Sequence, residues 1–158
     1  MPKSKRLLKV IIILALLAVI LTFLWPHSLI DIAEVGIESI SVVVVRNNLE
    51  LSSETYTFNV DDSEFETVAG ILNQNSYHVS ISTILSVIQG EAHLEGNEAG
   101  YWVNIYLYTE PDCCGECYSI ISGGTGDILI NDNIYRMGYC GNGKMLGFMD
   151  AVCEAVNP

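Results

Sequence analysis

The feature that most constrains this chain is its N-terminal segment, in which a basic stretch precedes a long apolar one. Four cations stand within the first nine residues: Lys3, Lys5, Arg6 and Lys9. Residues 10–25 carry no charge, and the segment from Leu7 to Trp25 has 19 residues. At about 1.5 Å per helical residue, this length nearly matches a hydrocarbon core of roughly 30 Å. The pattern predicts a transmembrane helix over residues 10–26, ended by Pro26.

A cleaved signal peptide has the same order of basic and apolar residues and is the main alternative. Its apolar region is usually about 7–15 residues long and ends in a small-x-small cleavage site. The apolar run here is longer, and residues 25–28 (Trp-Pro-His-Ser) contain no such site. Because the four cations precede the run, we expect residues 1–9 in the cytoplasm and residues 27–158 outside the cell. The sequence thus predicts a single-pass protein of the cell membrane.

The rest of the chain is strongly acidic. The protein has 7 basic and 19 acidic residues, and only Arg46, Arg136 and Lys144 remain once the four N-terminal cations are set aside. Nucleic acid is excluded as a partner, because its recognition needs a basic face. Cationic partners remain compatible with this charge, although scattered acids also serve solubility alone.

Residues 27–158 are enough for one domain with a sizeable core. Residues 76–82 alternate between apolar and polar side chains, residues 83–89 are either strand or a short helical turn, and residues 90–100 form an acidic loop. Six further segments have the β-branched content or the alternation of strands. They are residues 37–45, 55–60, 101–109, 118–122, 127–130 and 133–137.

Two segments have helical periodicity. Residues 63–74 begin with a capping box of Ser63 and Glu66 and continue with an apolar stripe, as do residues 142–156 after Asn142. The order β-β-α-β-β-β-β-α with short turns predicts an α+β fold. We expect a two-layer sandwich of a mainly antiparallel sheet, with both helices on one face. The expected stripes are Phe65, Val68, Ile71 and Leu72, and Met145, Met149, Val152 and Val156.

Four segments also resemble a known group of proteins. With the order of elements, residues 54–58, 77–83, 101–109 and 134–141 are similar to a family of small membrane-anchored extracellular domains of unknown function from Gram-positive bacteria. The resemblance covers most of residues 37–156. It implies the fold and the location, and because the family has no assigned activity it implies no site.

The five cysteines are the first place to look for chemistry. Cys113, Cys114 and Cys117 lie within one turn, while Cys140 and Cys153 stand apart. Cys114 and Cys117 have the spacing of a thiol-disulfide redox pair, but the motif leads into a strand and stands beside acids that would raise the pKa of a thiolate. A zinc site of Cys114, Cys117, Cys140 and Cys153 is a second alternative, although it lacks a second close pair. Structural disulfides are the ordinary interpretation outside the cell.

The predicted sheet order also indicates which cysteines meet. If residues 101–137 form an up-and-down meander, the cluster lies at one end of the sheet and Cys140 at the other, roughly 17 Å away. The last helix then rises about 17 Å from Asn142 to Cys153. We therefore expect a disulfide between Cys153 and Cys113, Cys114 or Cys117, with Cys140 unpaired.

One strand carries a candidate binding surface. In residues 101–109, Val103, Ile105 and Leu107 would face the helices, so the opposite face, which no expected helix covers, would bear a row of aromatic and amide side chains. Such a row can stack on sugar rings or grip a peptide. It could equally be ordinary sheet surface covered by residues 90–100 or by a partner. The row is Trp102, Asn104, Tyr106 and Tyr108.

These patterns favour a non-enzymatic, membrane-tethered extracellular domain. No serine lies in a nucleophile elbow, and His27, His78 and His93 have no recognisable nucleophile partner, so no catalytic residue, metal or cofactor is predicted. We expect the domain to bind a cell-envelope glycan, peptide or protein through the aromatic row. A thiol-disulfide redox protein and a metal-binding module are the alternatives.

Overall fold

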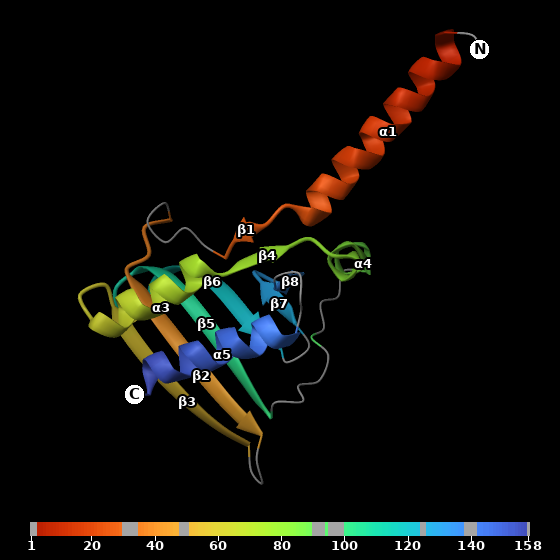
Figure 1. Cartoon of the computed structure of the whole chain (residues 1–158). Coiled ribbons are helices and arrows are strands. Elements are labelled where there is room, and N and C mark those ends of the chain that lie inside the picture. The colour runs from red at the N-terminus through yellow and green to blue at the C-terminus, as the bar shows by residue number, and fades with distance from the viewer. Residues whose placement is uncertain are drawn as a thin grey trace.

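The computed structural model contains one antiparallel β-sheet together with several helices (Figure 1). The structure describes residues 3–29, 35–47, 51–89, 94, 100–123, 126–137 and 142–157, which contain four helices and eight strands. The helices are α1 (Lys3–Leu24), α3 (Ser63–Gln74), α4 (Ile81–Gln89) and α5 (Asn142–Val156). The strands are β1 (His27–Ser28), β2 (Ser39–Asn47), β3 (Leu51–Asn59), β4 (Ser76–His78), β5 (Tyr101–Glu110), β6 (Cys114–Ser122), β7 (Asp127–Ile130) and β8 (Asn133–Met137).

The strand order in the sheet is β1-β4-β8-β7-β6-β5-β2-β3. Each pair of neighbours is antiparallel. The meander predicted for residues 101–137 is confirmed, because β5 to β8 are neighbours in chain order. The predicted order of elements is wrong in three places: the short strand β1 precedes β2, five strands rather than four separate α3 from α5 in the described chain, and α4 lies among them.

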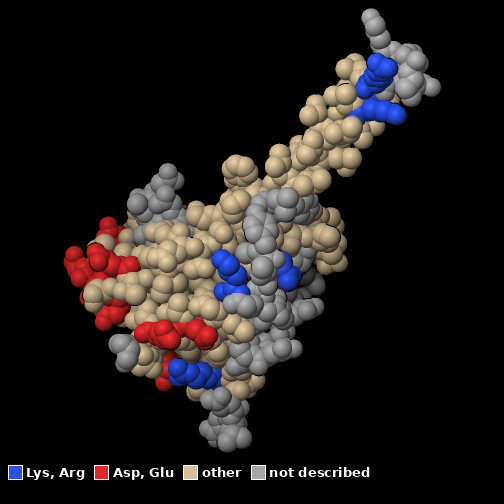
Figure 2. Space-filling model, in the orientation of Figure 1, with Lys and Arg blue, Asp and Glu red and all other residues tan. Residues whose placement is uncertain are grey.

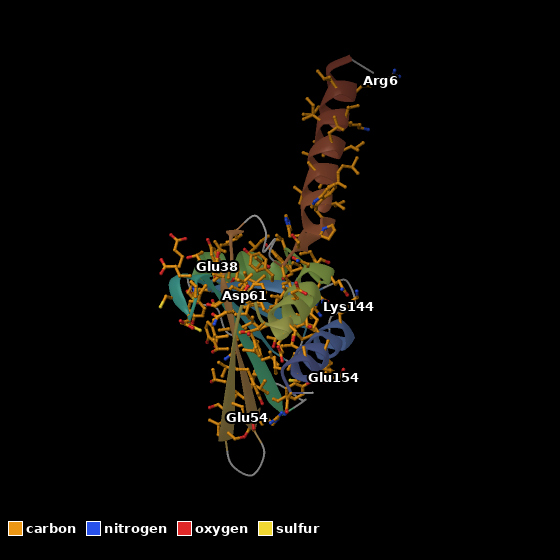
Figure 3. The ribbon with its side chains drawn as sticks, turned by 90° about the vertical axis from the view of Figure 1, so that its left-hand side faces the viewer. Arg6, Glu38, Glu54, Asp61, Lys144 and Glu154 are labelled. Carbon is orange, nitrogen blue, oxygen red and sulfur yellow. The ribbon has the colours of Figure 1, made fainter. Side chains whose placement is uncertain are left out.

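The core lies between one face of the sheet and two helices. Alternate residues of the central strands are fully buried, among them Val42 of β2 and Ile105 of β5. Buried side chains of α3 and α5 join the same cluster, and the two helices contact each other. The prediction that both helices pack on one sheet face is therefore confirmed, and Figures 1 and 3 show them side by side on that face. The helix residues are Phe65, Val68, Leu72, Met145, Met149 and Val152.

The predicted transmembrane helix is wrong. Within the described residues, no helix has both the length and the apolar character needed to cross a bilayer. Although α1 has 22 residues, Arg6 and Lys9 lie inside it. Its charge-free part, residues 10–24, would extend only about 22 Å at about 1.5 Å per residue, short of a hydrocarbon core of roughly 30 Å. The boundary expected between residues 9 and 10 falls inside this helix, and the cellular compartment stays a prediction.

The strand predicted over residues 76–82 ends at His78 in β4, and residues 83–89, for which strand and a short helical turn were both open, belong to helix α4 (Ile81–Gln89). Ser80 and Thr83 cap its start reciprocally: Ser80 N donates to Thr83 Oγ1 (2.9 Å), and Thr83 N donates to Ser80 Oγ (3.3 Å). This is the geometry of a capping box with threonine at its third position. The alternation of Val79 and Ile81 with serines favoured a strand, but this local hydrogen bonding ends the extended conformation.

The start of α3 also differs from the prediction. Asp62, not Ser63, is the N-cap residue, and its side chain makes no capping hydrogen bond. Its carboxylate instead accepts a hydrogen bond from Asn59 N at 2.7 Å. Asp62 therefore closes the turn between β3 and α3 rather than the first turn of the helix.

Candidate functional site

The aromatic row lies on the sheet face opposite α3 and α5. Trp102, Asn104, Tyr106 and Tyr108 alternate along β5 with fully buried residues and are all partly exposed. Figure 3, which shows the sheet close to edge-on, places both helices on one side of β2, β3 and β5. Sequence alternation therefore located these four side chains correctly, and the structure brings them together on one face.

Three neighbouring strands extend this face, which we call the open face. Directly paired residues on adjacent strands share a sheet face, so the register gives its members. None of the member side chains is charged, and two carboxylates lie at the Tyr108 end of the face: Glu110 follows Tyr108 by two residues on β5, and Asp112 Oδ1 accepts a hydrogen bond from Asn59 Nδ2 at 3.4 Å. The members are Ser39, Ser41, Val43 and Val45 of β2, Ser53, Thr55, Thr57 and Asn59 of β3, Trp102, Asn104, Tyr106 and Tyr108 of β5, and Cys117, Ser119 and Ile121 of β6.

One polar atom of the open face has no partner. Asn104 Oδ1 is buried and accepts no hydrogen bond within the described structure. The residues paired with Asn104 are Val43 on β2 and Ile121 on β6, whose side chains are apolar. A buried acceptor without a donor costs about 1–3 kcal/mol. The open face thus has an unsatisfied acceptor between its aromatic side chains.

Cysteines surround the Tyr108 end of the open face. Cys117 pairs with Tyr108 across the strands, and Cys113 Sγ lies 3.8 Å from Thr57 Oγ1, to which it donates. Burial first, then the charge and hydrogen bonding of Cys117 and the charge of Cys113, raise the pKa of Tyr108 to about 12. Tyr108 therefore stays protonated at neutral pH, with its hydroxyl in a hydrogen bond with Cys117.

The turn that holds these thiols has an unusual backbone. Asp112 (φ 55°) and Cys113 (φ 59°) are both left-handed, and Cys114 N donates to Pro111 O, which together form a type I′ turn. Ser39 Oγ supports it by accepting a hydrogen bond from Cys113 N (3.1 Å) and donating one to Glu110 O (2.8 Å). Neither Cys114 nor Cys117 lies at a helix N-terminus, the position that lowers the pKa of redox-active thiols.

The predicted bridge to Cys153 is not formed in the structure. Cys113, Cys114, Cys117 and Cys153 are all free, and Cys140 lies outside the described residues. Cys153 lies beside Arg46 and Tyr101, which are paired across β2 and β5. Along β2, Arg46 is seven residues from Ser39, and Ser39 contacts the cysteine cluster by accepting a hydrogen bond from Cys113 N. Seven strand residues extend about 23 Å, far beyond disulfide reach. Helix α5 crosses the strands instead of rising along β8, so its length carries Cys153 sideways (Figure 1).

The alternative zinc site is not assembled by these residues either. Its members Cys114 and Cys153 lie at opposite ends of the sheet, because α5 crosses the strands and carries Cys153 away from the cysteine cluster. Within the part of the chain that the structure describes, no three His, Cys, Asp or Glu side chains lie close enough to share a metal ion.

A polar cavity of about 280 Å³ lies at the Cys153 end and was not predicted. Tyr101 donates a short hydrogen bond to Asp150, and Arg46 pairs with Glu54 at 2.7 Å. Burial, followed by that hydrogen bond and the charge of Asp150, raises the pKa of Tyr101 far above its usual value. Burial also raises the pKa of Cys153, against the opposing effect of Arg46. Three elements, β2, β5 and α5, contribute the lining residues, so no spacing in the sequence could have indicated them.

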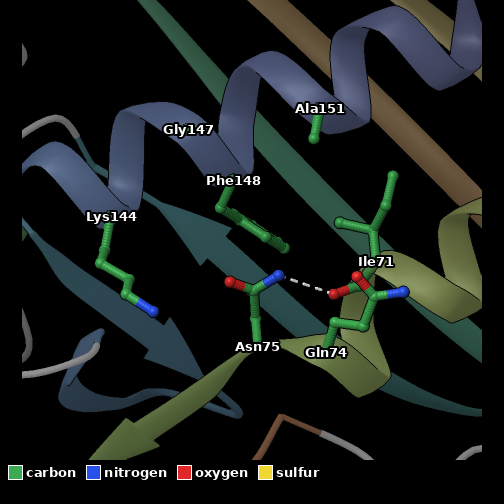
Figure 4. A pocket seen from close by; sticks show the side chains of 7 residues that line it. All are labelled: Ile71, Gln74, Asn75, Lys144, Gly147, Phe148 and Ala151. Carbon is green, nitrogen blue, oxygen red and sulfur yellow. Dashed lines mark hydrogen bonds between the residues drawn. The ribbon is translucent and has the colours of Figure 1, made fainter.

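A groove of about 480 Å³ lies between the end of α3 and α5 (Figure 4). Asn75 Nδ2 donates to Ile71 O at 2.7 Å, which fixes the amide at the groove wall. Gly147 and Ala151 leave the space, and their spacing of four residues on one helix face was the signal available in the sequence. The lining residues are Ile71, Gln74, Asn75, Lys144, Gly147, Phe148 and Ala151.

The chain matches no protein-family model, no curated protein and no solved structure. The resemblance to small anchored extracellular domains therefore stays a prediction. The open face is the candidate site that the geometry favours, because it combines aromatic surface, an unsatisfied acceptor and the absence of charge.

Proposed function

We propose that this protein is a non-enzymatic binding domain that takes an uncharged glycan of the cell envelope on its open face. The observation that carries the proposal is the unpartnered Asn104 Oδ1 within an aromatic, charge-free sheet surface. Each property of that surface matches a property of a neutral sugar.

The first match is between the hydroxyl groups of a sugar and the acceptor on Asn104. A sugar presents several O–H donors. Asn104 Oδ1 is buried beneath its neighbours, so a hydroxyl reaches it when a neighbouring side chain turns aside on binding, and the new hydrogen bond then removes the cost of a buried acceptor. Elsewhere on the open face, the hydroxyls of Thr55 and Thr57 on β3 and of Tyr108 on β5 supply further hydrogen-bonding groups. These contacts would fix the orientation of the ring.

The second match is between the apolar faces of sugar rings and the aromatic side chains. Trp102 and Tyr106 stand four residues apart on β5, about 13 Å along the strand, with Asn104 between them. Aromatic rings offer apolar area with little conformational entropy to lose on binding. An extended oligosaccharide lying along β5 would stack on both rings and reach the amide between them.

The third match is electrostatic. The members of the open face carry no charge, the carboxylates of Glu110 and Asp112 lie at its Tyr108 end, and the protein as a whole has a formal net charge of −12. Its long-range field repels anionic ligands, and the face has no cation to hold one. Neutral glycans avoid that repulsion, whereas anionic envelope polymers do not.

The test uses the full chain on an array of neutral and anionic cell-envelope glycans, followed by calorimetric titration with the neutral oligosaccharide that binds best. Asn104→Leu and Tyr106→Ala should each weaken binding about tenfold or more, because each removes a contact worth at least about 1.4 kcal/mol. Val60→Ala, at a 46% exposed apolar residue that follows β3 and lies off the open face, is the matched control and should leave the affinity unchanged.

Two results would overturn the proposal. One is binding that survives both Asn104→Leu and Tyr106→Ala, because the ligand would then lie elsewhere. The other is that the protein binds extended peptides and no neutral glycan, and that the two substitutions abolish the peptide binding. The open face would then serve a peptide or protein partner.

A further inference from the structure

Two apolar helices extend from the same corner of the sheet. The edge strand β1 pairs antiparallel with β4, with His27 opposite Tyr77 and Ser28 opposite Ser76. Helix α1 ends three residues before β1, and α4 begins three residues after β4. Because the two strands run in opposite directions, the end of α1 and the start of α4 meet at one end of this ladder. Figure 1 shows both helices at this corner.

Helix α4 is amphipathic, but its polar side is buried and its apolar side is exposed. Its small polar residues Thr83 and Ser86 are buried, and α4 packs against β8. Ser86 Oγ donates to Thr83 O at 2.9 Å, so these hydroxyls are satisfied within the helix. The large apolar side chains face outward, up to 74% exposed at Ile88. They are Ile81, Ile84, Leu85, Val87 and Ile88.

The surface of α1 shows what medium can cover this corner. Its apolar side chains from Leu7 to Leu21 are exposed on every side of the helix, about half or more of each. A protein groove needs one apolar side that matches its shape, and α1 has no such distinct side. A lipid layer needs none, because its acyl chains can contact whichever side of α1 turns toward them.

The charges at the corner complement a lipid headgroup layer. Residues 3–29 and 76–89 contain no acid, although the chain has 19. Trp25, 63% exposed, links α1 to β1 at the position of an interfacial aromatic. Arg136, which forms a partly exposed ion pair with Asp127 at 3.5 Å, lies opposite His78 in the β4–β8 pair, and β8 contacts α4. In Figure 2 the acidic side chains of the visible face gather away from α1.

From these observations we propose that the corner formed by Trp25 and the exposed face of α4 lies on a lipid surface, with α1 in contact with the same lipid. Helix α4 acts as an interfacial helix that lies in the plane of the headgroups. This contact fixes the orientation of the domain on the lipid, which α1 alone, joined by two residues to a two-residue strand, does not. The proposal is independent of what the open face binds.

The test compares amide hydrogen exchange of the full chain bound to phosphatidylcholine vesicles with that of the lipid-free chain. Amides of residues 81–89 should exchange at least about tenfold more slowly on vesicles, because lipid contact stabilises the helix against local opening. Amides of β3, which lies at the opposite edge of the sheet, should exchange at the same rate in both samples. Unchanged exchange in α4 on vesicle-bound chain would overturn the proposal.

A pair of matched variants tests the same contact by vesicle flotation. Leu85→Glu with Ile88→Glu should weaken partitioning onto the vesicles about tenfold or more, since charge replaces apolar contact. Leu51→Glu with Val60→Glu, at similarly exposed apolar residues away from the corner, should change it by about twofold or less. Equal partitioning of the two variants would overturn the proposal. So would α4 protection that appears without lipid and grows with protein concentration, because a second copy would then cover the helix.

Discussion

At the scale of single residues, backbone strain gathers in the turn between β5 and β6. Two non-glycine residues there are left-handed, and Gly115, with φ 76°, follows them as the extra residue of a β-bulge opposite Thr109. A Cβ at Gly115 would lie 2.6 Å from Thr109 Oγ1 and 3.0 Å from Glu110 Cγ. Only glycine fits this position, which sets the register that places Cys117 opposite Tyr108.

Gly115→Ala is therefore expected to destabilise the fold by about 1–3 kcal/mol, through the left-handed φ and the close contact with Thr109. Urea unfolding of the full chain, kept soluble in a mild non-ionic detergent, measures the change. Gly70→Ala is the matched control, because Gly70 lies within α3 and nothing lies within 4 Å of an added Cβ. It should instead stabilise by about 0.5–1 kcal/mol. Equal effects of the two substitutions would contradict the account of the bulge.

At the scale of elements, one face of the sheet carries the packing and the other the candidate site. Phe65, Val68 and Leu72 of α3 meet the α5 stripe on the covered face, where alternate strand residues are fully buried. The covered face therefore determines stability, and the open face can present aromatic side chains without weakening the core.

Leu72→Ala should cost about 2–5 kcal/mol, because Leu72 is fully buried between α3 and the sheet and its loss leaves a cavity. The same substitution at the exposed Leu51 should change the unfolding free energy by about 0.5 kcal/mol or less. Both changes in unfolding free energy are measured from the shift of the urea midpoint, with the m-value unchanged by the substitution. A loss at Leu72 no larger than that at Leu51 would mean that α3 is not packed on the sheet as described.

At the scale of the whole molecule, acidic charge dominates. The chain has 19 acids against 7 bases, and two ion pairs, Arg46–Glu54 and Arg136–Asp127, lie among the described residues. Both pairs are partly exposed, so each contributes little. Repulsion between unpaired carboxylates therefore outweighs attraction and disfavours the compact state.

Added salt is expected to raise the urea midpoint. The Debye length falls from about 30 Å at 0.01 M to about 8 Å at 0.15 M ionic strength, which screens carboxylates on opposite sides of the molecule from each other. Urea is the suitable denaturant because it is uncharged, and glycerol in place of salt controls for effects of the solvent. A midpoint that falls with salt would show that the ion pairs outweigh the repulsion.

The sequence by itself determined which residues lie on which side of the strands and helices. Alternation along β5 separated Val103 and Ile105 from Trp102 and Asn104, and periodicity in α5 selected Met145 and Met149 for the core. These predictions succeeded because side-chain direction follows from local backbone geometry. The antiparallel meander followed from the short turns, because parallel strands would need much longer connections.

Only the tertiary structure decided what depends on directions in space. Helix α5 has the length that the sequence predicts, but its path across the strands places Cys153 beside Arg46 rather than near Cys113. Residues 76–82 alternate like a strand, yet a local cap at Ser80 starts helix α4, whose apolar face lies outward. The unpartnered Asn104 Oδ1 depends on neighbours from β2 and β6. Helix crossing and cross-strand neighbours arise from packing between segments far apart in the chain, which no local pattern in the sequence encodes.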